Sequence, residues 1–504
     1  MMDDCRGRKL TRACLIQFQV ARFLLAVLLA GMSVTVSAQL VGAARQRMEA
    51  VQDHLSHYVV IRDAKNEEMS LRSQMKALNV PAVSIAAIRN GAIDWAQAYG
   101  FSSIDGGPVT TKTLFGAASI SKPVTALGVL KLVEEGKIDL DANVNQYLKR
   151  WKIPENEFTA KEKVTVRELL NHTSGIGTHN GEIYDPSEPL PTLLQLLDGE
   201  KPAKTVPVRV EAIPGTQFAY ANGGYLVLYL LIEDVTGQSF AAYMKRNVLD
   251  PIGMKDSTFE APLPLDWQLR AATAYGGDGK SAIPPGKFVE PNLAAGGLWS
   301  TPTDLAKFLM EVRREYEGKS HRVLHQKTMR MMLSPGMLSP PTRQYGLGFE
   351  VGGSPHDKFI RHGGSAFFQD DMVEYLRGDG IVVMTSGGGG GAIADEVMRS
   401  AAAVYDFPDF RPVEHSVVAV APSALSRFVG TYVYVKVALD GDHLTAEIPS
   451  GSPPARLYAE SPTHFFVIDG PQELSFIIDG QQKVTGVEFI TPLGRHSLDK
   501  STAQ

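Results

Sequence analysis

The sequence predicts an α/β protein of the α+β type: an antiparallel sheet flanked by helices and carrying a helical insertion, followed by a small all-β, barrel-like domain. Strand-like runs occur at both ends of the first 410 residues, while helical patterns fill the middle. From residue 424 onward, short β-rich runs alternate with turn residues. The chain has 504 residues, 44% of them hydrophobic, which is enough to bury a large core in about two to three domains.

Residues 1–38 have the layout of a secretory signal peptide. Basic residues precede an apolar stretch from Phe23 to Val36, and the small residues Ser37 and Ala38 come before Gln39. The apolar stretch is shorter than the roughly 20 residues that span a bilayer. We therefore expect cleavage and no integral membrane span afterwards, with a retained signal anchor as the alternative.

Composition excludes several classes of protein. Both cysteines, Cys5 and Cys14, fall within the predicted signal peptide, so the mature chain is expected to have no disulfide. The net charge of −5 offers no basic surface to recruit nucleic acid. His54 and His57 have helical spacing but no accompanying carboxylate pattern, which favours an exposed helix face over a zinc site. We expect no metal and no cofactor, and the oligomeric state is left open.

The main domain is predicted at residues 39–410. It opens with a β-hairpin, Ala82–Ile88 and Ala92–Tyr99, because Asn90-Gly91 between two strand-like runs is a strong turn signal. Strands so far apart in sequence are expected to join one antiparallel sheet. The late strands are expected at 346–351, 358–362, 371–377 and 381–385, and a closing helix at 393–404.

Residues 411–423 are predicted to be a linker, because Phe407–Pro412 breaks the preceding pattern. Residues 424–504 are predicted to form a small β-barrel or sandwich. Its strands are expected at 429–439, 443–448, 463–468, 473–478 and 483–490.

Ser119-Ile120-Ser121-Lys122 begins an apolar helical run and is the leading candidate for catalysis. Side chains at i and i+3 of a helix share a face, with Cβ atoms about 5 to 6 Å apart, so the Lys122 amine can touch the Ser119 hydroxyl. A serine needs an adjacent base, and a lysine serves as one when its pKa falls from about 10.4 towards neutrality. Burial and a helix N-terminus both lower that pKa.

The same spacing occurs twice more, beginning at Ser73 and at Ser497. Spacing alone therefore decides nothing. The run that follows Ser119 is apolar and predicts a buried helix, whereas Ser73 lies in a charged amphipathic stretch and Ser497 in the polar C-terminal tail. Only Ser119 is expected to be a nucleophile.

Tyr220 and Asn222 lie about a hundred residues later, in a loop before a helical pattern. Two residues apart in an extended segment, their side chains point the same way. The phenol of Tyr220 can relay a proton and the amide of Asn222 can hydrogen-bond a substrate carbonyl. Taken alone, such a tripeptide more often marks a capped loop.

His362-Gly363-Gly364-Ser365 closes a predicted strand. Gly364 and its glycine neighbour would let a substrate approach the strand edge, and the imidazole would orient substrate or a water molecule. A hydrogen-bonded histidine at a strand end explains the residue equally well.

Taken together and in this order, the three elements resemble the signature motifs of the serine β-lactamase-like, penicillin-recognising superfamily, closest to its class C β-lactamase, esterase and D-peptidase branch. The resemblance covers roughly residues 75–405, and it implies a β-lactamase/transpeptidase-like fold. The C-terminal β segment is similar to a lipocalin-like appendage found on some members. Further segments that look like family segments are 166–176, 249–254, 295–298 with Asp304 after it, and 345–348.

The resemblance implies a role for each residue. Ser119 would be the acylated nucleophile, Lys122 its base, Tyr220 the proton relay, and Asn222 the group that holds the acyl amide or ester. The backbone amides of Ser119 and Ser365 would be the oxyanion donors.

Two departures from the family pattern affect the expected activity. His362 stands where β-lactamases and penicillin-binding proteins typically carry a lysine, and we interpret it as a weaker, pH-dependent cation. After Ser365, Ala366-Phe367-Phe368 replaces a small glycine-rich continuation. These bulky rings would narrow the site or supply an apolar acyl pocket.

The sequence therefore predicts a secreted, periplasmic serine hydrolase that acts through an acyl-enzyme on an ester, amide or lactam carbonyl. Its partner would be a small-molecule or peptide acyl donor. The replacement of lysine by His362 favours esterase or D-amino-acid peptidase activity over β-lactam turnover. The alternative is a penicillin-binding, receptor-like protein that is acylated without efficient turnover.

Overall fold

A computed structural model describes residues 41–63, 69–103, 106–177, 181–276, 280–336, 344–449, 453–492 and 494–501. The predicted signal peptide at 1–38 lies outside these residues. The chain divides into two compact units, 1–50 and 51–504. In the first unit, residues 41–50 are helical, and all that follows concerns the second. No helix within the described ranges is long and apolar enough to cross a membrane.

The main domain contains one seven-stranded sheet in the order β3-β2-β12-β11-β10-β9-β8, in which every neighbouring pair is antiparallel. The predicted antiparallel sheet built from distant segments is thereby confirmed. Its strands are β2 (Ala82–Arg89), β3 (Ala92–Gly100), β8 (Gln344–Tyr345), β9 (Glu350–Ser354), β10 (Asp357–Ser365), β11 (Gln369–Tyr375) and β12 (Asp379–Ser386).

The hairpin of β2 and β3 turns at Asn90 and Gly91, whose φ angles are 50° and 73°. Two successive left-handed residues are what a type I′ turn requires, and Asn-Gly supplies them at low cost. The strand predicted at 346–351 begins later, at Glu350, because Gly348 has a φ of 95° and the chain bends there. All but the last residue of β2 are buried, so this strand lies in the middle of the core.

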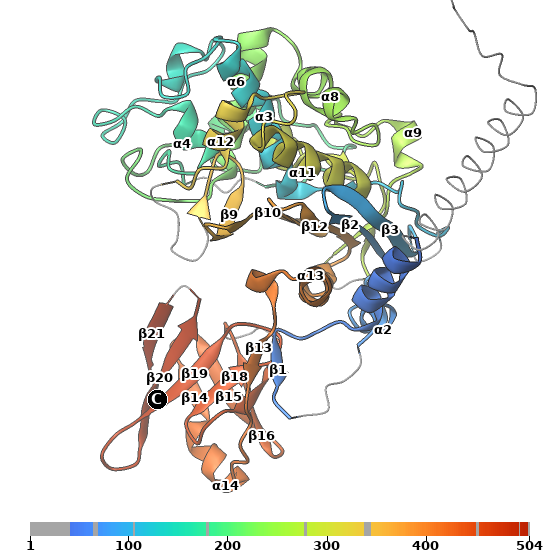
Figure 1. The fold of residues 1–504 in the computed structure, drawn as a ribbon. Coiled ribbons are helices and arrows are strands. Elements are labelled where there is room, and N and C mark those ends of the chain that lie inside the picture. The colour runs from blue at the N-terminus through green and yellow to red at the C-terminus, as the bar shows by residue number, and fades with distance from the viewer. Residues whose placement is uncertain are drawn as a thin grey trace, which may run out of the picture. The chain divides into compact units, whose positions relative to one another are not determined.

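Helices cover both faces of the sheet (Figure 1). Helix α11 (Pro302–Tyr316) packs against β2 and β12 on one face, and α13 (Gly390–Tyr405) packs against β11 and β12 on the other. The predicted helix at 393–404 is contained in α13. The remaining helices are α2 (Leu71–Ala77), α3 (Ser121–Glu134), α4 (Val166–Leu170), α5 (Leu193–Asp198), α6 (Asn222–Thr236), α7 (Phe240–Met244), α8 (Asp250–Ile252), α9 (Leu265–Gln268), α10 (Leu293–Gly296), α12 (Gln326–Met332) and α14 (Pro422–Leu425).

Helix α3 is buried nearly all round, which is why its sequence is apolar rather than amphipathic. It packs against α6, α7 and α10. A helix enclosed in this way can hold a side chain such as Lys122 out of contact with water.

The C-terminal region forms an eight-stranded antiparallel sheet that is barrel-like, because a bridge between Tyr432 and Lys500 brings its first strand to the end of its last. The run predicted as one strand at 429–439 is two strands, separated by a turn at Val433 with a φ of 55°. The strands at 455–459 and 494–499 were not predicted. The eight are β14 (Gly430–Tyr432), β15 (Val435–Asp440), β16 (His443–Glu447), β17 (Ala455–Ala459), β18 (His464–Val467), β19 (Glu473–Ile478), β20 (Val484–Thr491) and β21 (Gly494–Asp499).

The predicted linker at 411–423 is not free of regular structure. Its residues Val413–His415 form β13, which pairs in parallel with β1 (Val59–Ile61). The proposed domain boundaries at 410 and 424 stay predictions.

Candidate active site

Ser119 lies in a short 3₁₀ turn, Ala118–Ile120, directly before α3. Ala118 has a φ of 43°, a left-handed conformation that costs a non-glycine residue energy and is kept only where the surroundings enforce it. Two hydrogen bonds enforce it here: Ala117 N donates to Leu298 O at 2.7 Å, and Leu298 N donates to Ser121 Oγ at 2.9 Å. The turn holds the Ser119 side chain at a fixed, half-buried position.

Lys122 is fully buried one turn after Ser119. Its Nζ donates hydrogen bonds to Ser119 Oγ at 2.9 Å and to Ala295 O at 3.1 Å. Burial lowers the pKa of Lys122 to about 7, while the nearby carboxyl of Glu290 opposes that shift. Half of the molecules therefore carry a neutral amine near neutral pH, which is the state a general base needs.

Tyr220 completes the group around the nucleophile. Its hydroxyl interacts with the Ser119 side chain, which opposes part of the rise in its pKa, and Lys122 Nζ lies 4.8 Å from the centre of its ring. Burial raises the pKa of Tyr220 above its usual value, so the phenol keeps its proton at neutral pH. The three residues predicted to be catalytic are thus in mutual contact.

His172 holds the Tyr220 segment in place. Its carbonyl oxygen accepts a hydrogen bond from Ala219 N at 2.8 Å, and its ring Nδ1 accepts one from Ala221 N at 3.1 Å. The imidazole also packs against the Tyr220 ring, with centroids 4.3 Å apart. The two hydrogen bonds therefore hold the backbone on either side of Tyr220, and the His172 ring packs against its side chain.

Asn222 is the first residue of α6 and lines a pocket together with Ser119 and Ser365. Its carbonyl oxygen accepts a hydrogen bond from Asn292 Nδ2 at 3.0 Å, which ties the start of α6 to the start of α10. Its side-chain Oδ1 is buried and has no hydrogen-bond partner among the described residues. An unpaired buried acceptor costs stability unless a ligand supplies the donor.

His362 does not carry the charge expected of it. The side chain is 3% exposed, and its Nδ1 must bear the proton because it faces Gly363 O at 2.7 Å. Nε2 then accepts a hydrogen bond from the Tyr345 hydroxyl at 2.9 Å. Burial, with a contribution from Lys122, lowers the pKa of His362 to about 3. The interpretation of His362 as a pH-dependent cation is wrong: it is a neutral residue that joins β10 to Tyr345 and does not line the pocket.

Gly364 allows close packing within the protein. A Cβ at this position would collide with the carbonyl oxygen of Ala117. Only glycine therefore lets β10 approach the turn that carries the candidate nucleophile Ser119, which we call the nucleophile turn. The sequence suggested that glycine here admits a substrate, but the nearest neighbour is the protein's own backbone. Ser365, the next residue, ends β10 and is exposed at the pocket.

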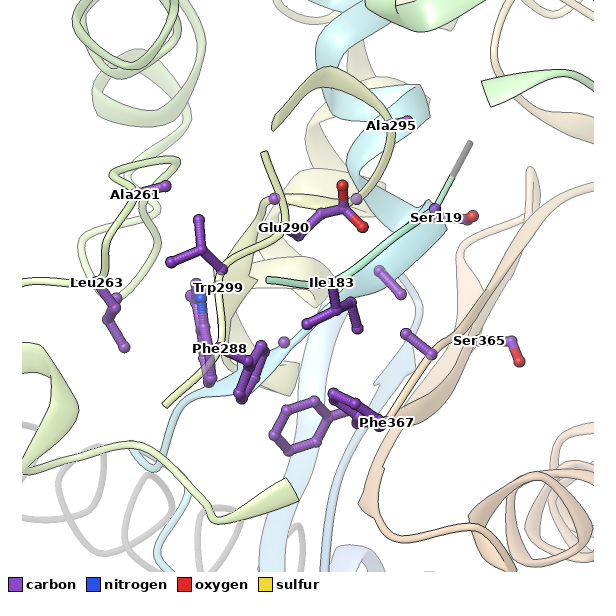
Figure 2. Close-up of a pocket in the computed structure, with 18 of the residues that line it drawn as sticks. Ser119, Ile183, Ala261, Leu263, Phe288, Glu290, Ala295, Trp299, Ser365 and Phe367 are labelled. Carbon is purple, nitrogen blue, oxygen red and sulfur yellow. The ribbon is translucent and has the colours of Figure 1, made fainter. Parts of the chain in front are cut away.

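Aromatic side chains form much of the pocket wall (Figure 2). Phe288 packs edge to face on Phe367 at 5.5 Å and at a tilt on Trp299 at 5.6 Å. Phe368 is buried against Gly116, whose lack of a side chain makes room for the ring. These rings line the same pocket as Ser119 and Asn222. Phe367 and Phe368 both line the pocket, and their role in narrowing the site or holding an acyl group stays a prediction.

Sequence reasoning missed Glu290, which lines the pocket and interacts electrostatically with Lys122. Burial raises the pKa of its carboxyl to about 8. Nothing in the surrounding sequence marks this glutamate except its position shortly before the 295–298 segment. His172 and Tyr345 were noticed only within family-like segments, and their contacts to Tyr220 and His362 are visible only in the fold.

The family model for Beta-lactamase matches residues 70–403, which is most of the chain. The protein belongs to the beta-lactamase family. Among its relatives in this family, Penicillin-binding protein 4* of Bacillus subtilis (strain 168) is 24% identical over 429 residues, covering 78% of this chain and 90% of that protein. Teichoic acid D-alanine hydrolase of Staphylococcus aureus is 28% identical over 232 residues, covering 46% of this chain and 54% of that protein.

Solved structures agree on the beta-lactamase fold. The octameric penicillin-binding protein homologue from Pyrococcus abyssi superimposes with a TM-score of 0.57 at 23% identity, covering 85% of this chain and 98% of that one. The structure of SurE with D-Leu matches with a TM-score of 0.53 at 20% identity, over 86% and 97% of the two chains. At these identities the likeness shows the fold alone.

Proposed function

We propose that this protein is a serine hydrolase that forms an acyl-enzyme at Ser119 on an ester, amide or lactam carbonyl. The observation that carries the proposal is the 2.9 Å contact between Lys122 Nζ and Ser119 Oγ, made by a fully buried lysine whose pKa is lowered to about 7. A nucleophile in contact with a base that is half neutral at physiological pH is what acyl transfer needs.

Acylation begins when the neutral Lys122 amine accepts the Ser119 proton while Oγ attacks the substrate carbonyl. The backbone amides of Ser119 and Ser365 stabilise the oxyanion, and Asn222 orients the acyl group. The Tyr220 phenol passes a proton to the leaving alcohol or amine, and the proton on Lys122 restores that phenol. The carbonyl re-forms as a serine ester when the leaving group departs.

Deacylation uses the same groups in reverse. A water molecule attacks the ester carbonyl and gives its proton to the Lys122 and Tyr220 pair, which returns a proton to Ser119 Oγ. The free acid then leaves the pocket. The raised pKa of Tyr220 keeps its proton available for both half-reactions.

The names of the relatives support both of the functions that the sequence predicts. One relative is named a hydrolase of D-alanine on teichoic acid and another a penicillin-binding protein. Neutral His362 leaves no cation to attract a β-lactam carboxylate at that position, which favours the esterase or D-amino-acid peptidase activity. A receptor that is acylated without efficient turnover is the alternative. We also propose secretion, on the layout of residues 1–38.

Incubation with a p-nitrophenyl ester, a D-alanyl amide and a chromogenic cephalosporin, followed by intact mass measurement, tests the proposal. Continuous product release from the ester or the amide is the expected result. A stable single adduct without release would favour the receptor alternative. Neither product nor adduct with any of the three would overturn the proposal.

A further inference from the structure

Glu290 is held rigidly at the pocket. Its Oε1 accepts a hydrogen bond from Asn292 N at 2.9 Å, and its Cγ, Cδ and Oε2 atoms pack over Gly296, where a Cβ would lie only 3.1 to 3.5 Å from them. No ion pair joins this carboxyl to any residue that the structure describes. Figure 2 shows its side chain reaching from its loop towards the side of the pocket that holds Ser119.

The ionisable side chains that line the pocket are all acidic. Its described lining contains two ionisable side chains, Glu260 and Glu290, and no lysine, arginine or histidine. Glu182 adds to the negative potential at Glu290. Lys122, whose charge acts on Glu290, is fully buried and is already hydrogen-bonded to Ser119 and Ala295. A substrate carboxylate would meet two carboxyl groups and no lining cation, whereas an ammonium group would meet a carboxyl that can ionise to pair with it.

Asn222 adds a second acceptor at the same place. Its buried Oδ1 has no partner among the described residues, and Asn222 lines the pocket with Glu290. A carboxyl and an amide oxygen are both acceptors, so they suit a group that carries several N–H donors and no acceptor. An ammonium has this chemistry.

We propose that Glu290, with Asn222 Oδ1, binds an ammonium group on the acyl part of the substrate, so that the enzyme acts on α-aminoacyl esters or amides. An α-ammonium lies two bonds from the carbonyl that Ser119 attacks, and Glu290 and Ser119 line one pocket. The aromatic wall would take the amino-acid side chain. This inference rests on the proposed hydrolase function and adds to it the class of acyl donor.

The protonation state of Glu290 in the empty site is consistent with a role in binding an ammonium group. Burial raises its pKa to about 8, so at pH 7 the empty site holds mostly the neutral acid. An arriving ammonium stabilises the carboxylate, and the proton that Glu290 loses goes to solvent. The binding site therefore need not hold an unpaired charge while it is empty.

Three p-nitroanilides that differ only in the group beside the carbonyl test the inference: D-alanyl, N-acetyl-D-alanyl and propionyl. We expect kcat/KM of the wild type to be about 10- to 100-fold higher for the free amine. In Glu290→Gln the ratio of kcat/KM between the free amine and the propionyl compound should fall to about one, mainly through a higher KM for the free amine. Glu200→Gln, which removes an exposed glutamate that does not line the pocket, should keep the preference.

A wild type that hydrolyses all three equally would overturn the inference without touching the proposed function. The same holds if Glu290→Gln keeps the preference, or if it loses activity equally on all three compounds. The wild-type comparison needs no variant, so it stands even if a variant fails to fold. Absence of hydrolysis and of any serine adduct in the wild type would instead count against the proposed function itself.

Discussion

Ser119 with Lys122 and Ser73 with Lys76 have the same spacing, both beside the start of a helix, and they have opposite surroundings. Ser73 is exposed, its hydroxyl accepts a hydrogen bond from Ser70 N at 3.1 Å as part of a capping box, and Lys76 is exposed too. Ser119 Oγ instead accepts a hydrogen bond at 2.9 Å from the amine of the buried Lys122. The same spacing stabilises a helix end in one place and brings a serine hydroxyl against a buried amine in the other, and burial of the lysine makes the difference.

The largest expected effect comes from removing the serine hydroxyl at each of the two places. Ser119→Ala should lower kcat for p-nitrophenyl ester hydrolysis by at least about 10³-fold, because the attacking oxygen is gone. Ser73→Ala should leave the rate unchanged. Both rates are read by p-nitrophenol release, and intact mass spectrometry should find no adduct on Ser119→Ala. Full activity of Ser119→Ala would refute the mechanism.

A second change tests the close packing of β10 against the turn that carries Ser119, which the exposed Ser73 lacks. Gly364→Ala should lower kcat by about 10- to 100-fold, because a methyl group would push β10 away from the Ala117 carbonyl and shift the nucleophile turn. Gly363→Ala is the matched control, since a Cβ there would lie at an ordinary 3.6 Å from Asp370 O. Steady-state kinetics on the same ester measure both. Equal losses in the two variants would contradict this account of Gly364.

The third prediction concerns pH. Because the pKa of Lys122 is lowered to about 7, the fraction of neutral base rises with pH, and kcat/KM should rise with it. The rate at pH 6 should be about tenfold below its alkaline plateau, with a midpoint near 7. Glu290 and Tyr220 face the same region, so the midpoint should move in Glu290→Gln. A rate that is flat between pH 5 and 8 would exclude Lys122 as the base.

The smallest expected effect is on stability. An unfolded lysine has a pKa of about 10.4, so folding at neutral pH places in the core an amine that prefers to be charged in water. This destabilisation is fully present below pH 7 and disappears as pH rises towards 10. Lys122→Met should raise the free energy of unfolding at pH 7 by about 1 to 4 kcal/mol, whereas Lys76→Met should change it by less than about 0.5 kcal/mol. Chemical denaturation measures both, and a lower stability of Lys122→Met would contradict the argument.

Sequence patterns predicted the parts of the fold that local signals encode. Asn90-Gly91 located the first hairpin, and alternating β-rich runs located most strands of the barrel-like sheet. The turn at Val433 was missed because neither glycine nor proline marks it. Strand β21 was missed because it is polar and largely exposed, so it lacks the alternation on which the prediction depends.

For the site, the sequence predicted which residues lie together but not the protonation state of each. The contacts among Ser119, Lys122 and Tyr220 agree with the expected group. The neutrality of His362 and the position of Glu290 depend on burial by segments far away in the chain, which no local pattern records. Charge states are properties of the fold, so a motif alone cannot supply them.

The order of strands in the sheet determines when the candidate site can be assembled. Strand β2 near the beginning of the domain pairs with β12 near its end, and the nucleophile turn packs on β10, which is made shortly before β12. A growing chain that has reached α12 already contains Ser119, Lys122 and Tyr220, but it lacks the strands that hold them together. Long-range pairing of this kind completes late in folding. The surroundings of Ser119 are therefore incomplete while the chain is being made, and on the proposed function a hydrolase of this kind would become active only once the last strand is in place.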